Sequence, residues 1–138
     1  MPEQPDPEHA RPDDVDDATV AAVGRISEAF EWIVRARGHL YDFHQMMGRA
    51  DATLGEGIDR LRDAGHASLA DELSSTWLGR NALPDRWSFE VVEAFDATYY
   101  DVASAGERRI RETLMAGRHH VHEAEMKADR RADGPTDD

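Results

Sequence analysis

The sequence predicts an all-α protein: a long antiparallel helical hairpin with a short connecting helix, dimerising into a four-helix bundle. Two stretches of apolar residues recur with the period of an α-helix, over residues 18–64 and from residue 88 onward. No stretch alternates apolar and polar residues as a half-buried strand does, and no Asn-Gly hairpin turn occurs. The length of 138 residues is that of one domain.

The first long helix is expected over residues 18–64. One position of its heptad repeat holds a large aliphatic residue in every heptad, and we call this row the aliphatic seam. The seam consists of Ile26, Ile33, Leu40, Met47, Leu54 and Leu61. Three positions further on, the residues are mostly Ala or Gly. A row of large residues beside a row of small ones allows a second helix to approach closely.

The ends of this helix have their own signals. Asp16 or Asp17 would cap its start, because an Asp side chain accepts a bond from a free backbone N–H and opposes the helix dipole. Gly65 would end it, because glycine adopts the left-handed conformation found just past a helix. A bend near Gly38 stays open as an alternative, and it would give a monomeric bundle of four segments.

A short helix is expected next, within residues 66–81. Its apolar side chains recur every four residues, at Leu69, Leu73 and Trp77. Gly79 would stop it, and Pro84 marks the loop that follows. The loop ends where Asp85 or Ser88 could begin the next helix.

The last helix is expected to run without a break to about Arg131. Its apolar stripe repeats every 3.6 residues on average, as in a straight helix. The stripe is Val92, Phe95, Tyr99, Val102, Gly106, Ile110, Leu114, Gly117, Val121, Ala124 and Ala128. Tyr99 and Tyr100 are adjacent, so only one of them can face the core, and the stripe favours Tyr99.

The two long helices have nearly equal lengths and a compact connector, so an antiparallel hairpin is expected. Placing residues 64 and 88 near the turn makes the numbers of facing residues add up to about 152. A lone hairpin buries one stripe on each helix, which is marginal for elements of this length. We therefore predict a homodimer that forms a coiled-coil-like four-helix bundle.

The composition limits the partners and the environment. The formal net charge is −13, so a nucleic acid would be repelled. No apolar run approaches the roughly 20 residues of a membrane span, and the acidic start of the chain is unlike a signal peptide. With no Cys there is no disulfide or thiolate site. An Asp-rich surface with a single Lys is typical of a salty cytoplasm, where salt screens repulsion between like charges.

The charge also divides the chain. Residues 1–17 are acidic and rich in proline, and residues 132–138 are acidic and poor in apolar side chains. Segments of this composition bury too little apolar surface to offset the entropy of ordering. We therefore expect two disordered tails around one helical domain over residues 18–131.

Polar residues interrupt the core face of the first helix at intervals of seven, at Arg37, His44 and Asp51. With the register given above, Tyr99 and Glu107 lie near His44 and Asp51. A buried polar side chain must be satisfied by a partner. One interpretation is a polar core layer of Arg37, His44, Asp51 and Tyr99 that fixes register. The other is a divalent metal centre of His44, Asp51 and Glu107.

A second polar cluster occupies residues 117–127, GRHHVHEAEMK. His120 and Glu123 share one helix face, as do His122 and Glu125. On a continuous helix this surface cluster, represented by His120, His122 and Glu125, does not converge on one point. It is then a salt-bridged helix end, or a site of surface metal capture or a pH-dependent contact, since His titrates near neutral pH.

Three runs are distinctive along the chain: GHLYDFHQMMGRAD, LGRNALPDRW and GRHHVHEAEMK. Over about residues 30–131 they resemble a family of small helical hypothetical proteins from haloarchaea. The resemblance implies an all-helical fold and a salty environment, and it implies no activity or site.

Signatures of catalysis are missing from the sequence. HExxH, a Gly-rich phosphate loop and the Glu-x-x-His pair of di-iron bundles are all absent. We therefore expect a non-enzymatic interaction or scaffold protein without an obligate cofactor, whose partner is a second copy or another protein. The alternative is a helical bundle that binds a metal or small ligand through core His and carboxylate groups.

Overall fold

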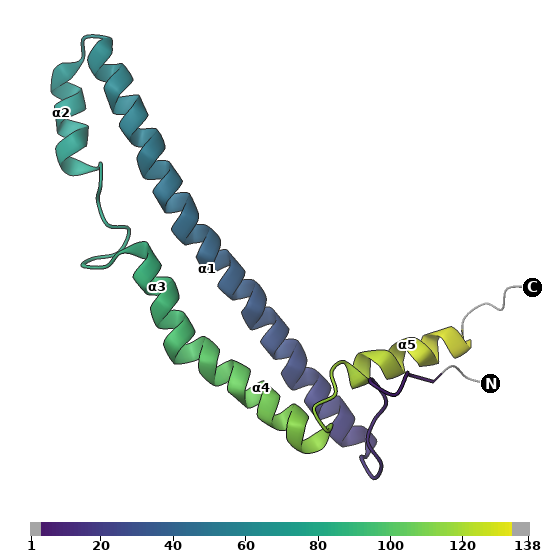
Figure 1. Cartoon of the computed structure of the whole chain (residues 1–138). Coiled ribbons are helices and arrows are strands. Elements are labelled where there is room, and N and C mark those ends of the chain that lie inside the picture. Colours follow the sequence, from purple (N-terminus) through teal and green to yellow (C-terminus); the bar gives the residue numbers. More distant parts are fainter. Residues whose placement is uncertain (1–3, 134–138) are drawn as a thin grey trace, which may run out of the picture. The chain divides into compact units, whose positions relative to one another are not determined.

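The computed structural model describes residues 4–133, and within that range it is helical without strands (Figure 1). The α-helices are α1 (Asp17–Asp63), α2 (Ala67–Thr76), α3 (Ser88–Phe95), α4 (Asp101–Leu114) and α5 (Val121–Asp133). One π-helical turn, η1 (Asp96–Tyr100), joins α3 to α4. The all-α prediction is confirmed. None of these helices is long and apolar enough to cross a membrane.

The chain divides into two compact units. Unit 1 contains the residues up to Val34 and those from Tyr100 onward, and unit 2 is Arg35–Tyr99. Helix α1 is common to both, and it continues through Gly38 without a break. Apart from its share of α1, unit 1 contains the residues before α1 together with α4 and α5, and unit 2 contains α2 and α3.

Both ends of α1 follow the sequence signals. The Asp16 carboxylate accepts a hydrogen bond from the Thr19 N–H at 2.8 Å, which is the contact of an N-cap. Hydrogen bonding from the Thr19 side chain, followed by that from its backbone N–H, lowers the pKa of Asp16. At the other end Gly65 has a φ of +94°. The His66 N–H bonds to the Leu61 carbonyl and the Gly65 N–H to the Arg62 carbonyl, the two bonds of a Schellman C-cap.

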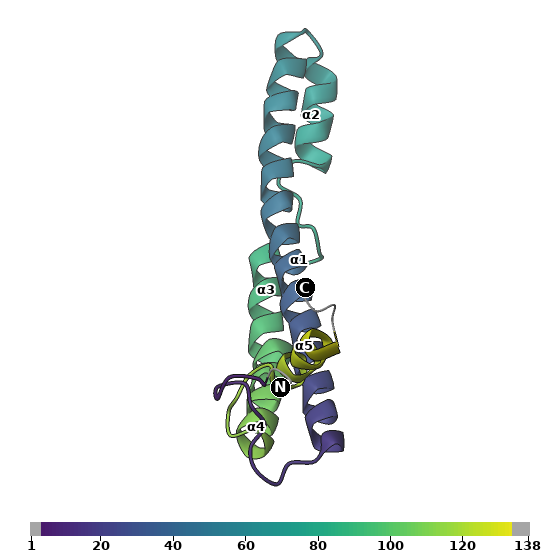
Figure 2. The same cartoon turned by 90° about the vertical axis from the view of Figure 1, so that its right-hand side faces the viewer.

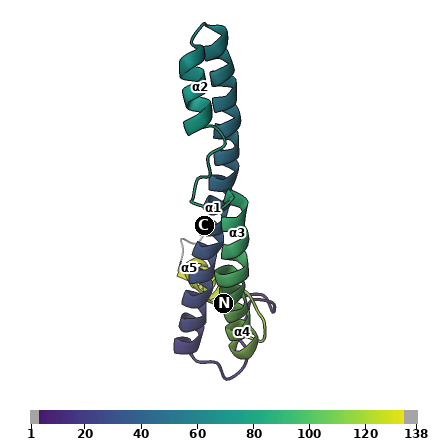
Figure 3. The same ribbon diagram turned by 90° about the vertical axis from the view of Figure 1, so that its left-hand side faces the viewer.

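In unit 2 the chain turns at Gly65, and α2 runs back along the end of α1 (Figures 2 and 3). Four side-chain contacts fix this antiparallel arrangement. They join Arg37 to Asp96, His44 to Ser88, Asp51 to Gly79 and Arg62 to Asp71. The numbers of each pair add up to between 130 and 133, so the expected value of about 152 is wrong. That expectation placed α2 at the turn. In the structure α2 and its loop belong to the segment that runs back along α1, residues 66–99, which we call the returning arm.

The stripe expected on the last helix is in phase only as far as η1. Val92 is buried, but Tyr99 and Val102 are 55% and 70% exposed. A π turn contains an extra residue compared with an α turn, so it rotates everything after it. Tyr100 therefore takes the inward position, with its ring 5.7 Å from that of Phe30. The choice of Tyr99 as the core tyrosine was wrong.

The last helix also breaks, contrary to the expected continuous helix to Arg131. Helix α4 ends at Leu114 and α5 starts at Val121, and α5 turns away from the direction of α4 (Figure 1). Gly117 has a φ of +76°, and its N–H bonds to the Arg111 carbonyl. The Arg111 guanidinium also donates to the Gly117 carbonyl at 2.7 Å. These bonds close the end of α4 and let the chain change direction.

The residues on either side of this break form part of the core of unit 1. Met115, directly after α4, is 1% exposed and packs with Val20 and Val23 of α1 and Val121 of α5. Ile110 and Val15 pack against this cluster. The core of unit 1 therefore depends on the turn between α4 and α5.

Residues 4–16 contain no helix but make specific contacts within unit 1. Arg11 donates two hydrogen bonds to the Glu125 carboxylate, at 2.7 and 3.0 Å, and its guanidinium lies 2.8 Å from Asp17. These bonds raise the pKa of Arg11. They weigh against disorder of this part of the 1–17 tail, whose disorder stays a prediction. Of the 132–138 tail, residues 134–138 lie outside the described residues.

Candidate functional site

The polar residues of α1 that face the returning arm in unit 2 each have a defined partner. The Arg37 guanidinium donates to both oxygens of the Asp96 carboxylate, at 2.7 and 2.9 Å. This hydrogen bond holds the pKa of Asp96 below its usual range. His44 Nδ1 lies 2.7 Å from the Ser88 hydroxyl, and the Asp51 carboxylate accepts the Gly79 N–H at 2.8 Å. Arg37, His44 and Asp51 thus all contact the returning arm, but none of them is buried and Tyr99 is 55% exposed, so a polar core layer stays a prediction.

The expected metal centre of His44, Asp51 and Glu107 is not assembled. The polar atoms of His44 and Asp51 bond to Ser88 and to the Gly79 backbone. His44 and Asp51 are themselves nearly two helical turns apart on α1. Glu107 belongs to unit 1, where its carboxylate accepts bonds from the Ser27 hydroxyl and the Arg111 guanidinium, both at 3.1 Å. Glu107 is engaged by a cation of the protein itself. The incorrect register had placed it near His44.

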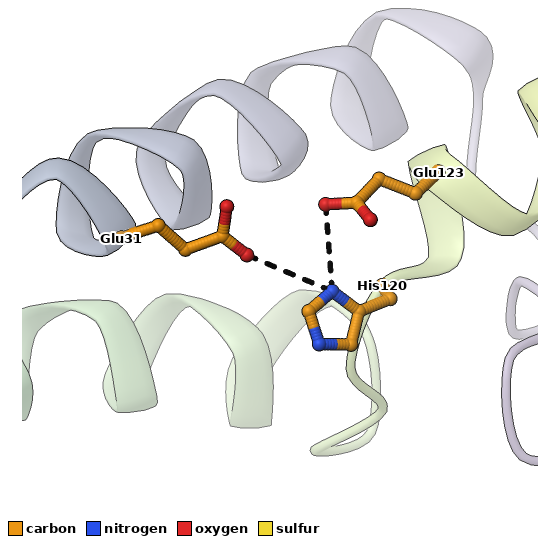
Figure 4. Close-up of side chains that lie close together, drawn as sticks. All are labelled: Glu31, His120 and Glu123. Carbon is orange, nitrogen blue, oxygen red and sulfur yellow. Dashed lines mark ion pairs between the residues drawn. The ribbon is translucent and has the colours of Figure 1, made fainter.

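A different group of potential metal ligands comes together in unit 1 (Figure 4). Glu31 of α1, His120 at the start of α5 and Glu123 of α5 bring one ligand atom each to within 4.8 Å of one another. His120 Nδ1 lies 3.5 Å from Glu123 Oε1 and 3.8 Å from Glu31 Oε1. Among residues 4–133 this is the only such group of three or more His, Cys or carboxylate side chains. We call it the His120 cluster.

Two local features position the His120 cluster. His120 has a φ of +57°, and its carbonyl accepts the Ala124 N–H at 2.9 Å in the first turn of α5. Gly24 lets α5 approach α1 closely, because a Cβ at position 24 would lie 2.8 Å from His122 Cβ. Gly24 and Glu31 are seven residues apart and share a face of α1. The close approach therefore places the start of α5 against the face that carries Glu31.

The rest of the 117–127 segment is divided among separate partners. His122 packs on Gly24, and Glu125 is bound by Arg11. Arg118 donates to the Ala10 carbonyl at 2.7 Å. His120, His122 and Glu125, which the sequence did not place at one point, thus have separate partners. Sequence spacing identified His120 and Glu123 as neighbours, but no local signal marked Glu31, which comes from a distant helix.

The His120 cluster lines a cavity of about 350 Å³ in unit 1. Its apolar wall includes the core residues Val20, Val23, Met115 and Val121, and the charged residues Glu28 and Arg118 also contribute. Such a cavity can hold a water molecule or a small ligand beside the three ligand atoms. His119, adjacent in sequence, does not line this cavity, and partial desolvation followed by the nearby Arg111 charge lowers its pKa.

Unit 2 has a groove of about 220 Å³, which we call the tryptophan groove. It lies between Trp77 and Trp87, with Met47 and Ala50 of α1 on its wall. Trp87 is 61% exposed and stacks on Phe89, with ring centroids 6.1 Å apart. The groove therefore presents aromatic and small side chains together on one surface.

Comparison with known proteins gives no relative. No family model matches the chain, and no curated protein or solved structure does either. The resemblance to haloarchaeal hypothetical proteins stays an expectation, and any function has to be argued from the geometry.

Proposed function

We propose that the protein is a non-enzymatic helical interaction module whose partner is a second copy of the same chain, docked on the aliphatic seam and tryptophan groove of unit 2. The observation that carries this proposal is the shortage of buried apolar side chains in unit 2. Only Ile58, Ala70 and Val92 are buried there, while eleven large hydrophobic side chains are 37–61% exposed. An isolated helical domain normally covers more of its large apolar residues.

The total exposed apolar area is comparable with the area that a stable dimer buries. A large apolar or aromatic side chain has on the order of 150–250 Å² of surface. Eleven such side chains about half exposed therefore present roughly 1,000 Å². A stable interface needs about 800 Å² from each partner. Tyr41 and Phe43 lie about 200° apart around α1, so one contact would bury part of this apolar area and polar side chains would supply the rest.

The arrangement of α1 favours a second copy over an unrelated protein. Leu40, Leu54 and Leu61 of the seam are half-buried, and Met47 is more exposed. The adjacent row is exposed and mostly small, with Ala36, Ala50, Gly57 and Ala64, and the exposed Phe43 interrupts it. In a twofold contact, the large residues of each copy would pack against the small row of the other. One surface then supplies both halves of the fit.

Charge makes this association dependent on salt. The whole chain carries −13, whereas residues 35–99 have 11 acidic and 7 basic side chains, a net of −4. Unit 2 is therefore the less repulsive part of the molecule on which to dock. At about 1 M salt the screening length falls to about 3 Å, which removes most of the remaining repulsion. A salty cytoplasm would supply this screening.

The test compares two identical substitutions on one helix. Ala50→Arg adds a bulky charge to the wall of the groove, whereas Ala52→Arg adds it about 200° around α1. Both alanines are exposed, so each variant should fold. Sedimentation equilibrium at about 1 M salt should give a dimer for the wild type and Ala52→Arg, and a monomer for Ala50→Arg.

Three results would overturn the proposal. A monomeric wild type would remove the second copy as the partner and leave the groove to another protein. Equal dimerisation of both variants would place the interface elsewhere on the chain. Equal loss of dimer in both variants would mean that the added charge, and not the groove, decides association.

A further inference from the structure

We propose that the His120 cluster is a binding site for a divalent transition metal of the zinc class, held by Glu31, His120 and Glu123 in unit 1. All three ligands come from one chain, so the site does not depend on self-association. It also differs from the core metal centre that the sequence predicted, since it shares no residue with it.

The separations between ligand atoms fit a bound cation. Zinc bonds to His nitrogen and carboxylate oxygen are about 2.0–2.2 Å long, which puts tetrahedral ligands about 3.4 Å apart. His120 Nδ1 lies 3.5 and 3.8 Å from the two Glu oxygens. A charge-assisted hydrogen bond between the same groups would be about 2.7–2.9 Å. His120 Nδ1 is thus within ion-pair distance of both carboxylates but farther than a close hydrogen bond, and the three ligand atoms lie within 4.8 Å of one another.

The charges and ligand types also favour a cation. Two carboxylates converge on one imidazole nitrogen (Figure 4), and among the described residues neither Glu31 nor Glu123 forms an ion pair with Arg or Lys. Glu107, Glu125 and Asp96, in contrast, each have an Arg partner. Imidazole with carboxylate is a donor set that zinc accepts. A divalent ion would neutralise the two negative charges directly.

The cavity supplies an argument that is independent of the ligand distances. Glu31, His120 and Glu123 all line the cavity of about 350 Å³ in unit 1. Three protein ligands leave one tetrahedral position open, as in zinc sites that bind water or a small ligand. A water molecule or a small anionic group in the cavity could occupy that position, with the apolar wall of the core behind it.

The test is calorimetric titration of the untagged full chain with a zinc salt at about pH 7.5, because imidazoles bind metals in their neutral form. We expect one ion per chain. His120→Asn removes the nitrogen ligand while keeping a residue that tolerates positive φ. Glu31→Gln and Glu123→Gln each remove one carboxylate. Each variant should bind zinc at least about tenfold more weakly.

Two matched controls separate this site from adventitious binding. His119→Asn changes the adjacent His, and Glu28→Gln changes a Glu that lines the same cavity one turn before Glu31. Both should bind zinc within about twofold of the wild type, well inside the factor expected for loss of a ligand. Circular dichroism should show the same helicity for every variant.

The opposite pattern would overturn the assignment. If no zinc binds at micromolar concentration, the three side chains lie close together but do not form a metal site. Zinc binding that survives His120→Asn, or that His119→Asn weakens equally, would be adventitious capture by surface histidines. Because Glu31 and Glu123 are changed separately, loss of folding in one variant still leaves the other to decide.

Discussion

The close approach of α1 and α5 at Gly24 makes a prediction that one pair of substitutions can test. A Cβ added at Gly24 would lie 2.8 Å from His122 Cβ and 2.9 Å from Cγ, against about 3.5–4.0 Å for an ordinary carbon contact. These atoms are next to the backbone of α5, so the helix itself has to move. A Cβ added at Gly38 of the same helix meets nothing within 4 Å.

The magnitude follows from a comparison in which helix propensity cancels. Replacing Gly by Ala inside a helix gains about 1 kcal/mol at either position. Overpacking at Gly24 costs about 1–3 kcal/mol in addition. Gly38→Ala should therefore stabilise the protein, and Gly24→Ala should be less stable than Gly38→Ala by about 1–3 kcal/mol.

Urea unfolding of both variants, followed by circular dichroism at one salt concentration, measures this difference. Gly24→Ala should also weaken zinc binding, because the start of α5 carries His120 and Glu123 of the proposed site. If Gly24→Ala is as stable as Gly38→Ala, the contact between α1 and α5 is wrong, and the position of His120 relative to Glu31 is wrong with it.

Three further predictions concern other contacts. Met115→Ala should destabilise the protein by about 2–5 kcal/mol in urea unfolding, because Met115 is 1% exposed in the core of unit 1; a loss below 1 kcal/mol would contradict that core. Asp96→Asn should lower the melting temperature at neutral pH. Since Arg37 lowers the folded-state pKa of Asp96, the carboxylate stabilises the fold above about pH 4 and loses this effect as the pH falls through the lowered pKa. The difference from the wild type should therefore shrink in acid, and a constant difference would refute the ion pair. Arg11→Ala should speed proteolysis of residues 4–16, because it removes the bonds to Glu125. Arg25→Ala, which removes an exposed pair with Glu28 within α1, should not, and equal rates would favour the expected disordered tail.

The sequence contained the signals for individual helices because those signals are local. Asp16 and Gly65 act through their own backbone and near neighbours, and they lie where α1 begins and just after it ends. Gly79, expected to stop the short helix, lies three residues past the end of α2. The continuity of α1 followed from its unbroken heptad pattern. The spacing of Arg37 and His44 likewise placed them correctly on the face that meets the returning arm.

Errors arose where tertiary contacts compete with local periodicity. An average spacing of 3.6 concealed the π turn at Asp96–Tyr100 and the break before Val121, because each changes the phase of the helix face. The register failed because the direction of α2 is set by its packing and not by its sequence. Glu31 could not be found from sequence, since its relation to His120 exists only after α5 packs on α1.

The central claim, that unit 2 docks on a second copy, is tested most directly by the mass of the untagged wild-type chain in solution. Multi-angle light scattering behind size-exclusion chromatography would follow that mass over a range of protein concentrations, at about 0.1 M and about 1 M salt. The proposal predicts twice the 15.5 kDa of one chain at high salt, with dissociation favoured at low salt. A mass of 15.5 kDa at every protein and salt concentration would contradict it.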